Sequence, residues 1–315
     1  MTKIFIDGEA GTTGLQILDR LKNRREFELL HLTDNKRKDK NARAEMLNAA
    51  DVCILCLPED ASRDAINLIQ NDTTKVIDAS IAFRTDPDWD YGFPEYRQNQ
   101  PEIIYNSKRV SNPGCYACAS VAIIYPLVAA GILPNDFPIT INAVSGYSGG
   151  GKSLIRAFEE QSYEEKIDVP FYLYGLGLAH KHTPEIKKWS GLENSPLFVP
   201  SVGRFYQGML VSVPLQLWQL SNNVKASMIH EVLSQHYLNE EFIKVQSLSD
   251  SQHKVKLDPE ELNGTNELRL SIFTDASEDQ AVICAQLDNL GKGASGQAIQ
   301  NLNVMLGLEA NSGLI

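Results

Sequence analysis

A short apolar strand, a glycine-rich turn and a helix follow one another at the start of the chain, and this order constrains the fold more than any other feature. Residues 3–7 predict a buried strand and residues 15–23 predict a helix. The turn between them carries three glycines in the spacing GxxGxxG, which lets the backbone approach a pyrophosphate at the N-terminus of the helix. A plain strand-to-helix turn fits the same glycines. A dinucleotide site here would use Gly8, Gly11, Thr12, Thr13 and Gly14.

The alternation of strands and helices continues to about residue 110. Further strands are predicted at 28–33, 51–57 and 75–78, with a helix at 61–70. The strand at 51–57 is continuously apolar, which is typical of a parallel strand covered on both faces. Strands that alternate with helices predict a doubly wound parallel sheet. We therefore predict an α/β protein with an N-terminal Rossmann-type domain over residues 1–112.

The loop after the second predicted strand contains residues that discriminate between the two nicotinamide cofactors. An acidic residue there, such as Asp34, binds a ribose hydroxyl, whereas basic residues suit a 2′-phosphate. A basic run extends from Lys36 to Lys38. This run favours NADP, with Lys36 as the contact, although a solvated loop fits the same charges.

Past residue 138 the pattern changes to longer and more polar strands. They are predicted at 139–144, 208–217, 267–274 and 280–287. Alternating apolar and polar residues, as at 209–213, favour an antiparallel sheet with one solvated face. We therefore predict a second, α+β domain with a mainly antiparallel sheet over residues 113–292, which serves catalysis and oligomerisation. A C-terminal helix within residues 293–315 is predicted to complete the first domain.

The segment Ser111-Asn112-Pro113-Gly114-Cys115-Tyr116-Ala117-Cys118 is the strongest candidate for chemistry. A strand-like run at 102–105 precedes it, and an almost wholly apolar stretch at 117–130 predicts a buried helix after it. Because Pro113-Gly114 marks the junction, Cys115 is expected at or just before the first helical turn. Unpartnered N–H groups there stabilise a thiolate, the nucleophilic form of cysteine. A small buried thiol and a Cys115–Cys118 redox pair remain alternatives, and Cys118 is expected in the core.

A glycine-rich loop at residues 146–153, GYSGGGKS, satisfies the P-loop pattern GxxxxGK[ST] between a predicted strand and a helix at 154–161. A nucleotide triphosphatase is therefore a rival interpretation. Against it, the loop lies in the middle of the chain, and the following segments do not resume a parallel α/β pattern. A glycine-rich cradle for another anion fits better.

The segment His180-Lys181-His182-Thr183-Pro184-Glu185 is the second candidate for chemistry. Two histidines and a glutamate can hold zinc, but the sequence offers no obvious third ligand at a suitable spacing. Structural histidines are a second interpretation. General acid/base catalysis is the third, because histidine titrates near neutral pH. We favour acid/base catalysis and predict no metal site.

Charge and cysteine content narrow the class of partner. The net charge of −11 argues against nucleic acids and anionic membranes. No run approaches the ~20 apolar residues that span a bilayer, and the N-terminus has no apolar signal core. Five cysteines without framework spacing suggest reduced thiols. We expect a cytoplasmic enzyme that acts on a small molecule.

Together these motifs resemble the N-acetyl-gamma-glutamyl-phosphate reductase family, and the resemblance runs nearly end to end. It rests on the GxxGxxG turn, NPGCY at 112–116, HKHTPE at 180–185 and NLGKGASGQA at 289–298. DASIAFR at 78–84 is similar to the family's DLSADFR, and YGFPE at 91–95 is similar to its YGLPE. The layout is also similar to aspartate-semialdehyde dehydrogenase and, more remotely, to glyceraldehyde-phosphate dehydrogenase.

The resemblance implies an NADP-dependent step of arginine biosynthesis in which an acyl phosphate is reduced through a cysteinyl thioester. It implies Cys115 as the nucleophile and a histidine as the acid/base, with His182 as our first choice and His180 as the second. The implied cofactor contacts in the second domain are Ser148, Gly149 and Asn289, and the candidates for substrate binding are Arg84, Asn112, Lys152 and Arg204.

The chain departs from the commoner long form of the family in three places. SGYSGGGK at 145–152 stands where the long form has SGVSGAGR, a loop that lies at the active site in that family, so the P-loop match is explained as coincidence. Ala82 replaces the Asp of SADFR, so any role of that carboxylate is lost. Arg204 lies three residues away from the position where the family has an arginine before a glycine. These differences point to the shorter class of the same enzyme.

Two interpretations from other classes stay open. One is a related dehydrogenase acting on a different acyl phosphate, such as aspartyl phosphate or a carrier-linked aminoadipate derivative. The other is an NADP-binding sensor in which Cys115 is inert. In each case a homodimer or homotetramer is expected, because the alternating second sheet suits an interface.

Overall fold

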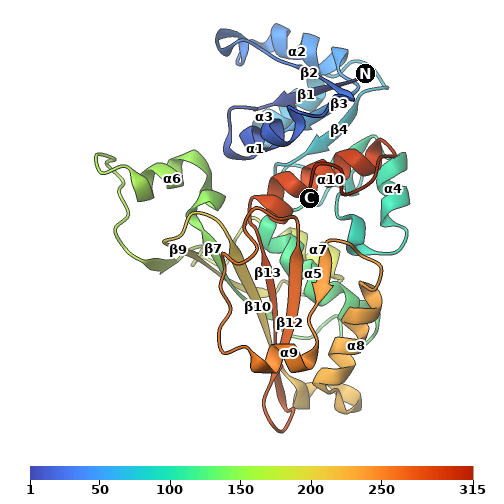
Figure 1. Cartoon of the computed structure of the whole chain (residues 1–315), viewed down its shortest axis with the longest axis vertical. Coiled ribbons are helices and arrows are strands. Elements are labelled where there is room, and N and C mark those ends of the chain that lie inside the picture. Colours follow the sequence, from blue (N-terminus) through green and yellow to red (C-terminus); the bar gives the residue numbers. More distant parts are fainter. Residues whose placement is uncertain (315) are drawn as a thin grey trace. The chain divides into compact units, whose positions relative to one another are not determined.

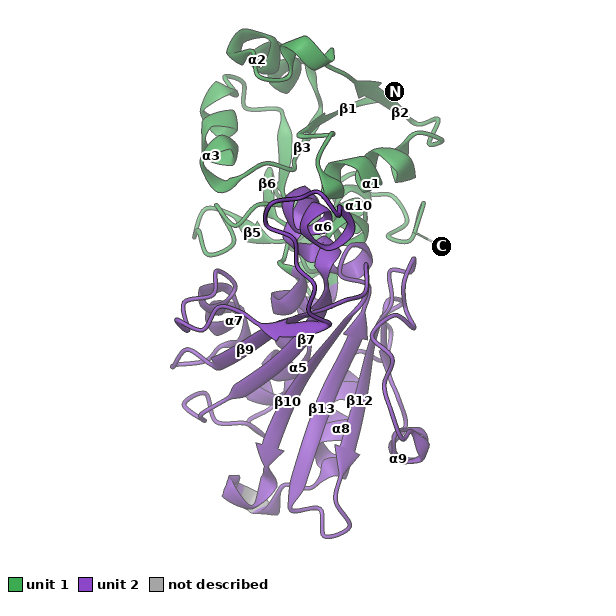
Figure 2. Cartoon of the chain, turned by 90° about the vertical axis from the view of Figure 1, so that its left-hand side faces the viewer, with its two compact units in different colours: residues 1–94, 98–114, 294–315 green, residues 95–97, 115–293 purple. Residues whose placement is uncertain are grey.

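The computed structural model describes residues 1–314 (Figure 1). The chain divides into two compact units (Figure 2). Unit 1 comprises Met1–Pro94, Gln98–Gly114 and Ala294–Ile315, and unit 2 comprises Glu95–Arg97 and Cys115–Gly293. The C-terminal segment therefore belongs to the same unit as the N-terminal strands. Cys115 is the first residue of the long segment, Cys115–Gly293, that forms most of unit 2.

Unit 1 is built on a six-stranded sheet in which every pair of neighbouring strands is parallel. The strands are β1 (Thr2–Asp7), β2 (Phe27–Leu30), β3 (Val52–Leu55), β4 (Lys75–Asp78), β5 (Asp90–Tyr91) and β6 (Arg109–Ser111). The helices are α1 (Thr12–Leu21), α2 (Lys40–Ala49), α3 (Glu59–Leu68), α4 (Gln100–Asn106) and α10 (Gly296–Met305). Strand order β2-β1-β3-β4-β6-β5 puts the reversal of direction between β1 and β3, which is where doubly wound sheets bind ligands. All four residues of β3 are buried, as continuous apolarity predicts.

The prediction of a strand at residues 102–105 was wrong. These residues lie in helix α4, and the strand that pairs with β4 is β6, a few residues later. Pro101 stands in the first turn of α4, where its fixed φ angle favours a helix. Ile104 alone of residues 102–105 is fully buried, so a short apolar run was read as a buried strand when it is one face of a short helix.

Unit 2 is built on a seven-stranded sheet with four antiparallel and two parallel strand pairs. The strands are β7 (Thr140–Gly146), β8 (Phe171–Leu173), β9 (Leu197–Gly203), β10 (Met209–Gln216), β11 (Ile243–Val245), β12 (Leu268–Thr274) and β13 (Gln280–Leu287). The helices are α5 (Cys115–Ala129), α6 (Gly151–Glu159), α7 (Thr183–Ser190), α8 (Ala226–His236) and α9 (Leu248–His253). The predicted α/β fold with a mainly antiparallel second sheet is therefore confirmed.

Helix α5 is the central element of unit 2. It packs against β10 and β13 of the sheet and against α7 and α8, and its side chains are buried almost all the way round (Figure 1). A helix without a polar face needs such cover on every side. Each fully buried Ile or Leu side chain contributes about 1.5–3 kcal/mol to stability. Cys118 is fully buried in this core, as predicted, and the position of Cys115 at the start of α5 is fixed by the packing of the whole helix.

Candidate active site

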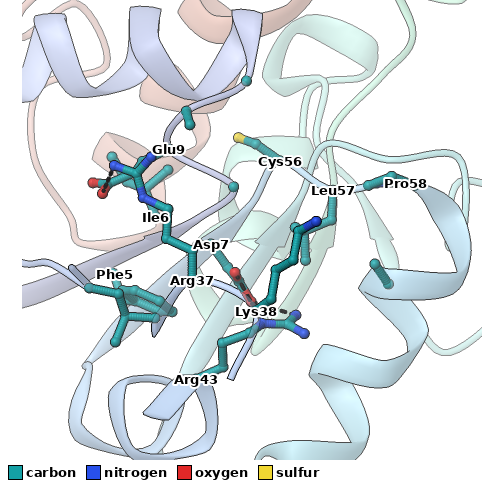
Figure 3. A pocket seen from close by; sticks show the side chains of 15 residues that line it. Phe5, Ile6, Asp7, Glu9, Arg37, Lys38, Arg43, Cys56, Leu57 and Pro58 are labelled. Carbon is teal, nitrogen blue, oxygen red and sulfur yellow. Dashed lines mark hydrogen bonds and ion pairs between the residues drawn. The ribbon is translucent and has the colours of Figure 1, made fainter. Parts of the chain in front are cut away.

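The glycine turn after β1 borders a cavity of about 370 Å³ at the carboxyl ends of β1 and β3 (Figure 3). Gly8 has a φ angle of +91°, and a Cβ atom there would lie 2.4 Å from the carbonyl oxygen of Cys56. A Cβ atom at Gly14 would lie 2.4 Å from the carbonyl oxygen of Gly8. Only glycine therefore permits this close packing. The cavity lies where a dinucleotide would bind in a doubly wound sheet.

The N-terminus of α1 lies next to this cavity, and the helix begins at Thr12, three residues earlier than the helix predicted from residue 15. Its N-cap residue Gly11 offers no side chain to bond the first N–H groups. Such N–H groups, together with the helix dipole, attract a phosphate. Gly8 and Gly11 line the cavity, and Thr12, Thr13 and Gly14 form the first turn of the helix next to it.

Three basic side chains line the cavity, and Lys36 is not among them. Arg37 and Lys38 come from the loop after β2, and Arg43 comes from α2 (Figure 3). Lys36 is exposed and is the last residue of the short 3-10 turn Asp34–Lys36. The basic run was recognised from sequence, but nothing in it indicated which of its side chains line the cavity, so Arg37 and Lys38 were missed as candidates.

Two of the three basic residues, Arg37 and Arg43, are held by carboxylates at the end of β1 and in the turn after it. Arg43 Nη2 lies 2.8 Å from Oδ2 of Asp7, whose side chain is almost fully buried. Burial raises the pKa of Asp7 above its ordinary value, and the bonds to Arg43 oppose this rise. Arg37 Nη2 lies 3.2 Å from Oε1 of Glu9. The cavity therefore has two arginines held by carboxylates, and the Glu9 side chain that partners Arg37 is only 12% exposed.

Asn112 and Arg84 build a hydrogen-bonded support beneath the segment that leads to Cys115. Asn112 is 1% exposed; its side chain accepts a bond from Asn301 Nδ2 (2.9 Å) and donates to the carbonyl of Ala294 (3.1 Å). Arg84 is also buried, and its Nε donates to the backbone carbonyl of Asn112 (3.0 Å). The hydrogen bonds described here for these two predicted substrate contacts therefore go to other parts of unit 1.

Cys115 is half-buried at the first position of α5, as predicted. Its Cβ atom faces Gly293, where an added Cβ atom would lie only 2.7 Å away. The backbone of the turn at 291–295 therefore lies directly against the cysteine. The helix N-terminus provides N–H groups that stabilise a thiolate at this position.

His180 is locked into a chain of hydrogen bonds that ends on the backbone. Its Nδ1 accepts a bond from the backbone N–H of His182 (3.1 Å), so in the neutral ring the proton lies on Nε2. Nε2 is 3.3 Å from the hydroxyl of Tyr174, which donates to the hydroxyl of Tyr116 (3.2 Å). Tyr116 donates in turn to the carbonyl of Ser201 (3.2 Å). Both ring nitrogens of His180 are thus used.

The charge state of His180 follows from its surroundings. Burial, together with the neighbouring charge of Lys181, lowers the pKa of His180 to about 4. Burial also raises the pKa of Tyr174 to about 12, so this phenol stays protonated at neutral pH. His180 is therefore a neutral, hydrogen-bonded histidine across the physiological pH range.

His182 is the N-cap residue of α7 and is 5% exposed. Its ring meets the ring of Tyr116, the residue next to Cys115, with 5.8 Å between the centroids. The ring of His180 lies 4.9 Å from it at nearly a right angle. The structure thus brings both histidines to the tyrosine that follows the cysteine, and it uses His180 as a support for the backbone of His182.

Ser148, Gly149 and Asn289 meet inside unit 2, although 140 residues separate them. Asn289 Nδ2 donates to Oγ of Ser148 (3.1 Å), and Asn289 Oδ1 accepts a bond from the N–H of Gly208 (2.7 Å). A Cβ atom at Gly149 would lie 3.3 Å from Asn289 Nδ2. The glycine-rich loop follows β7, which pairs parallel with β9 and antiparallel with β10, so it follows a strand of a mixed sheet and not of the parallel sheet that a P-loop opens.

Lys152 and Arg204 differ in how their charges are used. Lys152 is exposed in the first turn of α6. Arg204 Nε donates to the carbonyl of Val169 (3.3 Å), its Nη2 donates to the carbonyl of Ile167, and the guanidinium lies 5.3 Å from the ring centroid of Phe158. Arg204 therefore holds the loop before β8.

The described part of the chain also bears on two other kinds of function. Among residues 1–314, no group of three or more His, Cys, Asp or Glu side chains is arranged to hold a metal ion. Within the same residues, no helix is both long enough and apolar enough to cross a membrane.

Comparison with known proteins decides the family. A model of the semialdehyde dehydrogenase dimerisation domain matches residues 115–289, and a model of the NAD-binding domain of semialdehyde dehydrogenases matches residues 3–103. N-acetyl-gamma-glutamyl-phosphate reductase from Trichormus variabilis is 52% identical, with 99% of each chain covered. The chain belongs to the N-acetyl-gamma-glutamyl-phosphate reductase family. A member from Burkholderia lata is 48% identical over 96% of each chain.

A solved structure shows that this family shares its fold with a neighbouring one. Aspartate semialdehyde dehydrogenase II from Vibrio cholerae, complexed with ASA, superposes with a TM-score of 0.71 over 98% of each chain, at 16% identity. At that identity the likeness concerns the fold alone. The predicted family and its oxidoreductase class are confirmed by the close relatives, not by this superposition.

The neutral state of His180 has a consequence for pH dependence. Because its pKa in the folded protein is about 4, below the ordinary value of 6.5, the unfolded chain binds the proton first as the pH falls. The stability due to neutral His180 is therefore complete above pH 6.5 and is lost as the pH falls toward 4. We expect the urea midpoint of His180→Gln to vary less with pH in this window than that of the unchanged protein.

The exposed His253 provides the matched control, since His253→Gln should leave the slope of the midpoint against pH unchanged. Nuclear magnetic resonance of the histidine rings gives a second measurement. A His180 ring that titrates near pH 6.5 would contradict the hydrogen-bonded arrangement described above.

Proposed function

We propose that this protein is a cytoplasmic enzyme that reduces N-acetyl-gamma-glutamyl phosphate to N-acetyl-L-glutamate 5-semialdehyde and phosphate, with NADPH, in arginine biosynthesis. The observation that supports this most strongly is Cys115 at the first position of the buried helix α5, in a chain 52% identical to a reductase of that name over 99% of its length. The cavity of unit 1 and the cysteine and histidines of unit 2 supply the groups that this reaction needs.

The cavity of unit 1 fits a dinucleotide. Gly8 and Gly14 leave no room for side chains, so the backbone forms the wall that a pyrophosphate needs. We assign the pyrophosphate to Gly8, Gly11 and the first turn of α1, and the 2′-phosphate of NADP to Arg37 and Lys38. When bound, NADPH supplies the hydride of the reaction.

Cys115 forms the covalent bond to the substrate. Its thiolate attacks the acyl carbon, the bond from that carbon to the phosphate oxygen breaks, and phosphate leaves with the bonding electrons. The N–H groups at the start of α5 stabilise the thiolate before the attack and the developing oxyanion during it. After reduction, the carbon–sulfur bond of the hemithioacetal breaks, which releases the aldehyde and regenerates the thiolate.

His182 moves the proton. It donates to the oxygen of the hemithioacetal as this forms, and it takes the proton back when the aldehyde is released. His180 is unsuited to this role, because its Nδ1 already accepts the backbone N–H of His182 and burial keeps its ring neutral. We assign His180 to hold His182 in place.

This proposal gives three of the four predicted substrate residues another role. Lys152 stays a substrate contact, since it is exposed on the first turn of α6 beside the glycine-rich loop. Arg84 and Asn112 instead position the segment before Cys115, through the bond between them (3.0 Å). Arg204 supports the loop before β8, and Asn289 orders Ser148 and Gly149 for the nicotinamide end of the cofactor.

The first experiment is the reverse reaction: N-acetylglutamate semialdehyde, phosphate and NADP, followed by the absorbance of the reduced cofactor. We expect phosphate-dependent turnover that falls on the order of 10³-fold or more in Cys115→Ser. Cys284→Ser is the matched control, because Cys284 is another half-buried thiol of unit 2.

Three results would separate the rival functions. Turnover of aspartate semialdehyde in place of the acetylated substrate would keep the mechanism and change the substrate. No turnover by a protein that still binds NADP would favour the sensor. Full activity in Cys115→Ser would refute the covalent mechanism.

Recognition of the 2′-phosphate is tested by binding. Replacement of Arg37 by alanine should weaken NADP binding about tenfold, which corresponds to the ~1.4 kcal/mol of one charged hydrogen bond, and should leave NAD binding unchanged. Isothermal titration calorimetry with both dinucleotides measures this, and Lys40→Ala, an exposed lysine of the same segment, is the control. A larger effect of Lys36→Ala than of Arg37→Ala would return the contact to the residue first predicted.

We propose further that the protein is a homodimer formed through unit 2. The edge strand β8 and the residues around it expose apolar side chains: Val169, Phe171, Leu173, Leu176 and Leu178 are each more than 45% exposed. An exposed apolar edge of this kind marks an interaction site. The match of residues 115–289 to a semialdehyde dehydrogenase dimerisation domain supports a second copy of the chain as the partner.

Light scattering tests the dimer. We expect a mass of twice 35.0 kDa for the unchanged protein and a single-chain mass for the double variant Phe171→Glu/Leu173→Glu. The exposed Trp218, which lies outside this edge, gives the control Trp218→Glu, which should remain dimeric. A monomer in the unchanged protein, or an unchanged mass in the double variant, would contradict the proposed interface.

A further inference from the structure

Lys292 and Glu95 form an ion pair that no solvent reaches. Their side chains are 0% and 1% exposed, and Lys292 Nζ lies 2.7 Å from Oε1 of Glu95. The ring of Phe242 covers the ammonium group, with 5.5 Å from Nζ to its centroid. Removing two charges from water costs several kcal/mol per ion before their attraction is counted. A pair this deeply buried calls for an explanation beyond stability.

Lys292 is one residue away from the contact with Cys115. It lies in the π-helical turn Gly291–Ser295, whose third residue is Gly293. The N–H of Gly293 donates to the carbonyl of Asp288 (2.9 Å), which closes the turn. A Cβ atom at Gly293 would lie 2.7 Å from Cβ of Cys115. Any shift of this turn would therefore displace the backbone that packs against the nucleophile.

The segment that contains Glu95 packs against helix α5, farther along that helix from Cys115. The ring of the next residue, Tyr96, packs on the ring of Tyr125 in α5, with 4.1 Å between the centroids. The carbonyl of Tyr96 lies 3.1 Å from Nε2 of His236 in α8. The segment at 95–97 thus packs against α5. The ion pair connects this segment to the turn that contacts Cys115, the first residue of α5.

From this geometry we propose that Lys292 and Glu95 are positioning residues: their ion pair holds the turn at 291–295, and through Gly293 it fixes the Cys115 side chain for attack. The inference rests on the proposed function for its kinetic consequence. It assigns neither residue a contact with the substrate.

The double variant Lys292→Met/Glu95→Gln tests the proposal. It removes both charges at nearly constant volume, and such replacements of whole buried ion pairs are often neutral for stability. We expect a fold with an unchanged urea midpoint, a kcat reduced about tenfold or more, and a KM changed less than threefold. The rate at which iodoacetamide alkylates Cys115, followed by peptide mass spectrometry, should change at least threefold.

A matched control comes from another ion pair of unit 2. Arg269 lies 2.8 Å from Glu267, outside the turn and α5, so Arg269→Met should change neither kcat nor the alkylation rate. If the double variant does not fold, Gly293→Ala replaces it, because the added methyl group pushes on Cys115 directly. That variant should alter kcat and alkylation in the same way.

The outcomes distinguish failure of the positioning role from failure of the proposed function. Unchanged kcat and unchanged alkylation in a folded double variant, or in Gly293→Ala, would overturn the positioning role. Absence of reductase activity in the unchanged protein would refute the proposed function, whereas the alkylation rates would still decide whether the ion pair positions Cys115.

Discussion

The contact between Gly293 and Cys115 is the constraint on which unit 2 depends. The contact requires a glycine at position 293 and the start of a helix at Cys115. Two segments separated by more than 170 residues must therefore be placed to within a fraction of an ångström. Helix α5 meets its half of the requirement by being buried on all sides. The turn at 291–295 is held by the hydrogen bond from the Gly293 N–H to the Asp288 carbonyl and by the ion pair of the buried Lys292.

Each unit also contains buried polar groups that hold one another in place. In unit 1, Asn301 donates a hydrogen bond to Asn112, and in unit 2 His180, Tyr174 and Tyr116 form a chain of hydrogen bonds that ends on a backbone carbonyl. Buried hydrogen-bonded networks favour one arrangement, because breaking them leaves buried donors without acceptors. In the proposed mechanism, the chemistry is carried out by the Cys115 thiol and the His182 imidazole, and their neighbours fix where these two side chains lie.

Sequence reasoning succeeded where a local pattern had one physical meaning. Continuous apolarity at Val52–Leu55 meant a covered parallel strand, and Pro113-Gly114 before an apolar run meant a helix that begins at Cys115. It failed where the answer depended on distant partners. Residues 102–105 were too short to show a period, the register of the basic run could not favour Arg37 over Lys36, and no pattern revealed that Arg204 is occupied by carbonyls of the loop at 167–169.

The way in which the chain threads through its two units limits how such a protein can be divided. Unit 2 borrows three residues, Glu95–Arg97, from within the sequence of unit 1. A gene fragment that encodes only residues 115–293 would lack the carboxylate that faces Lys292. Recombination at residues 115 and 293 would therefore produce a unit 2 in which the buried charge of Lys292 has lost Glu95. Unit 2 is therefore encoded by two stretches of the sequence that must be inherited together.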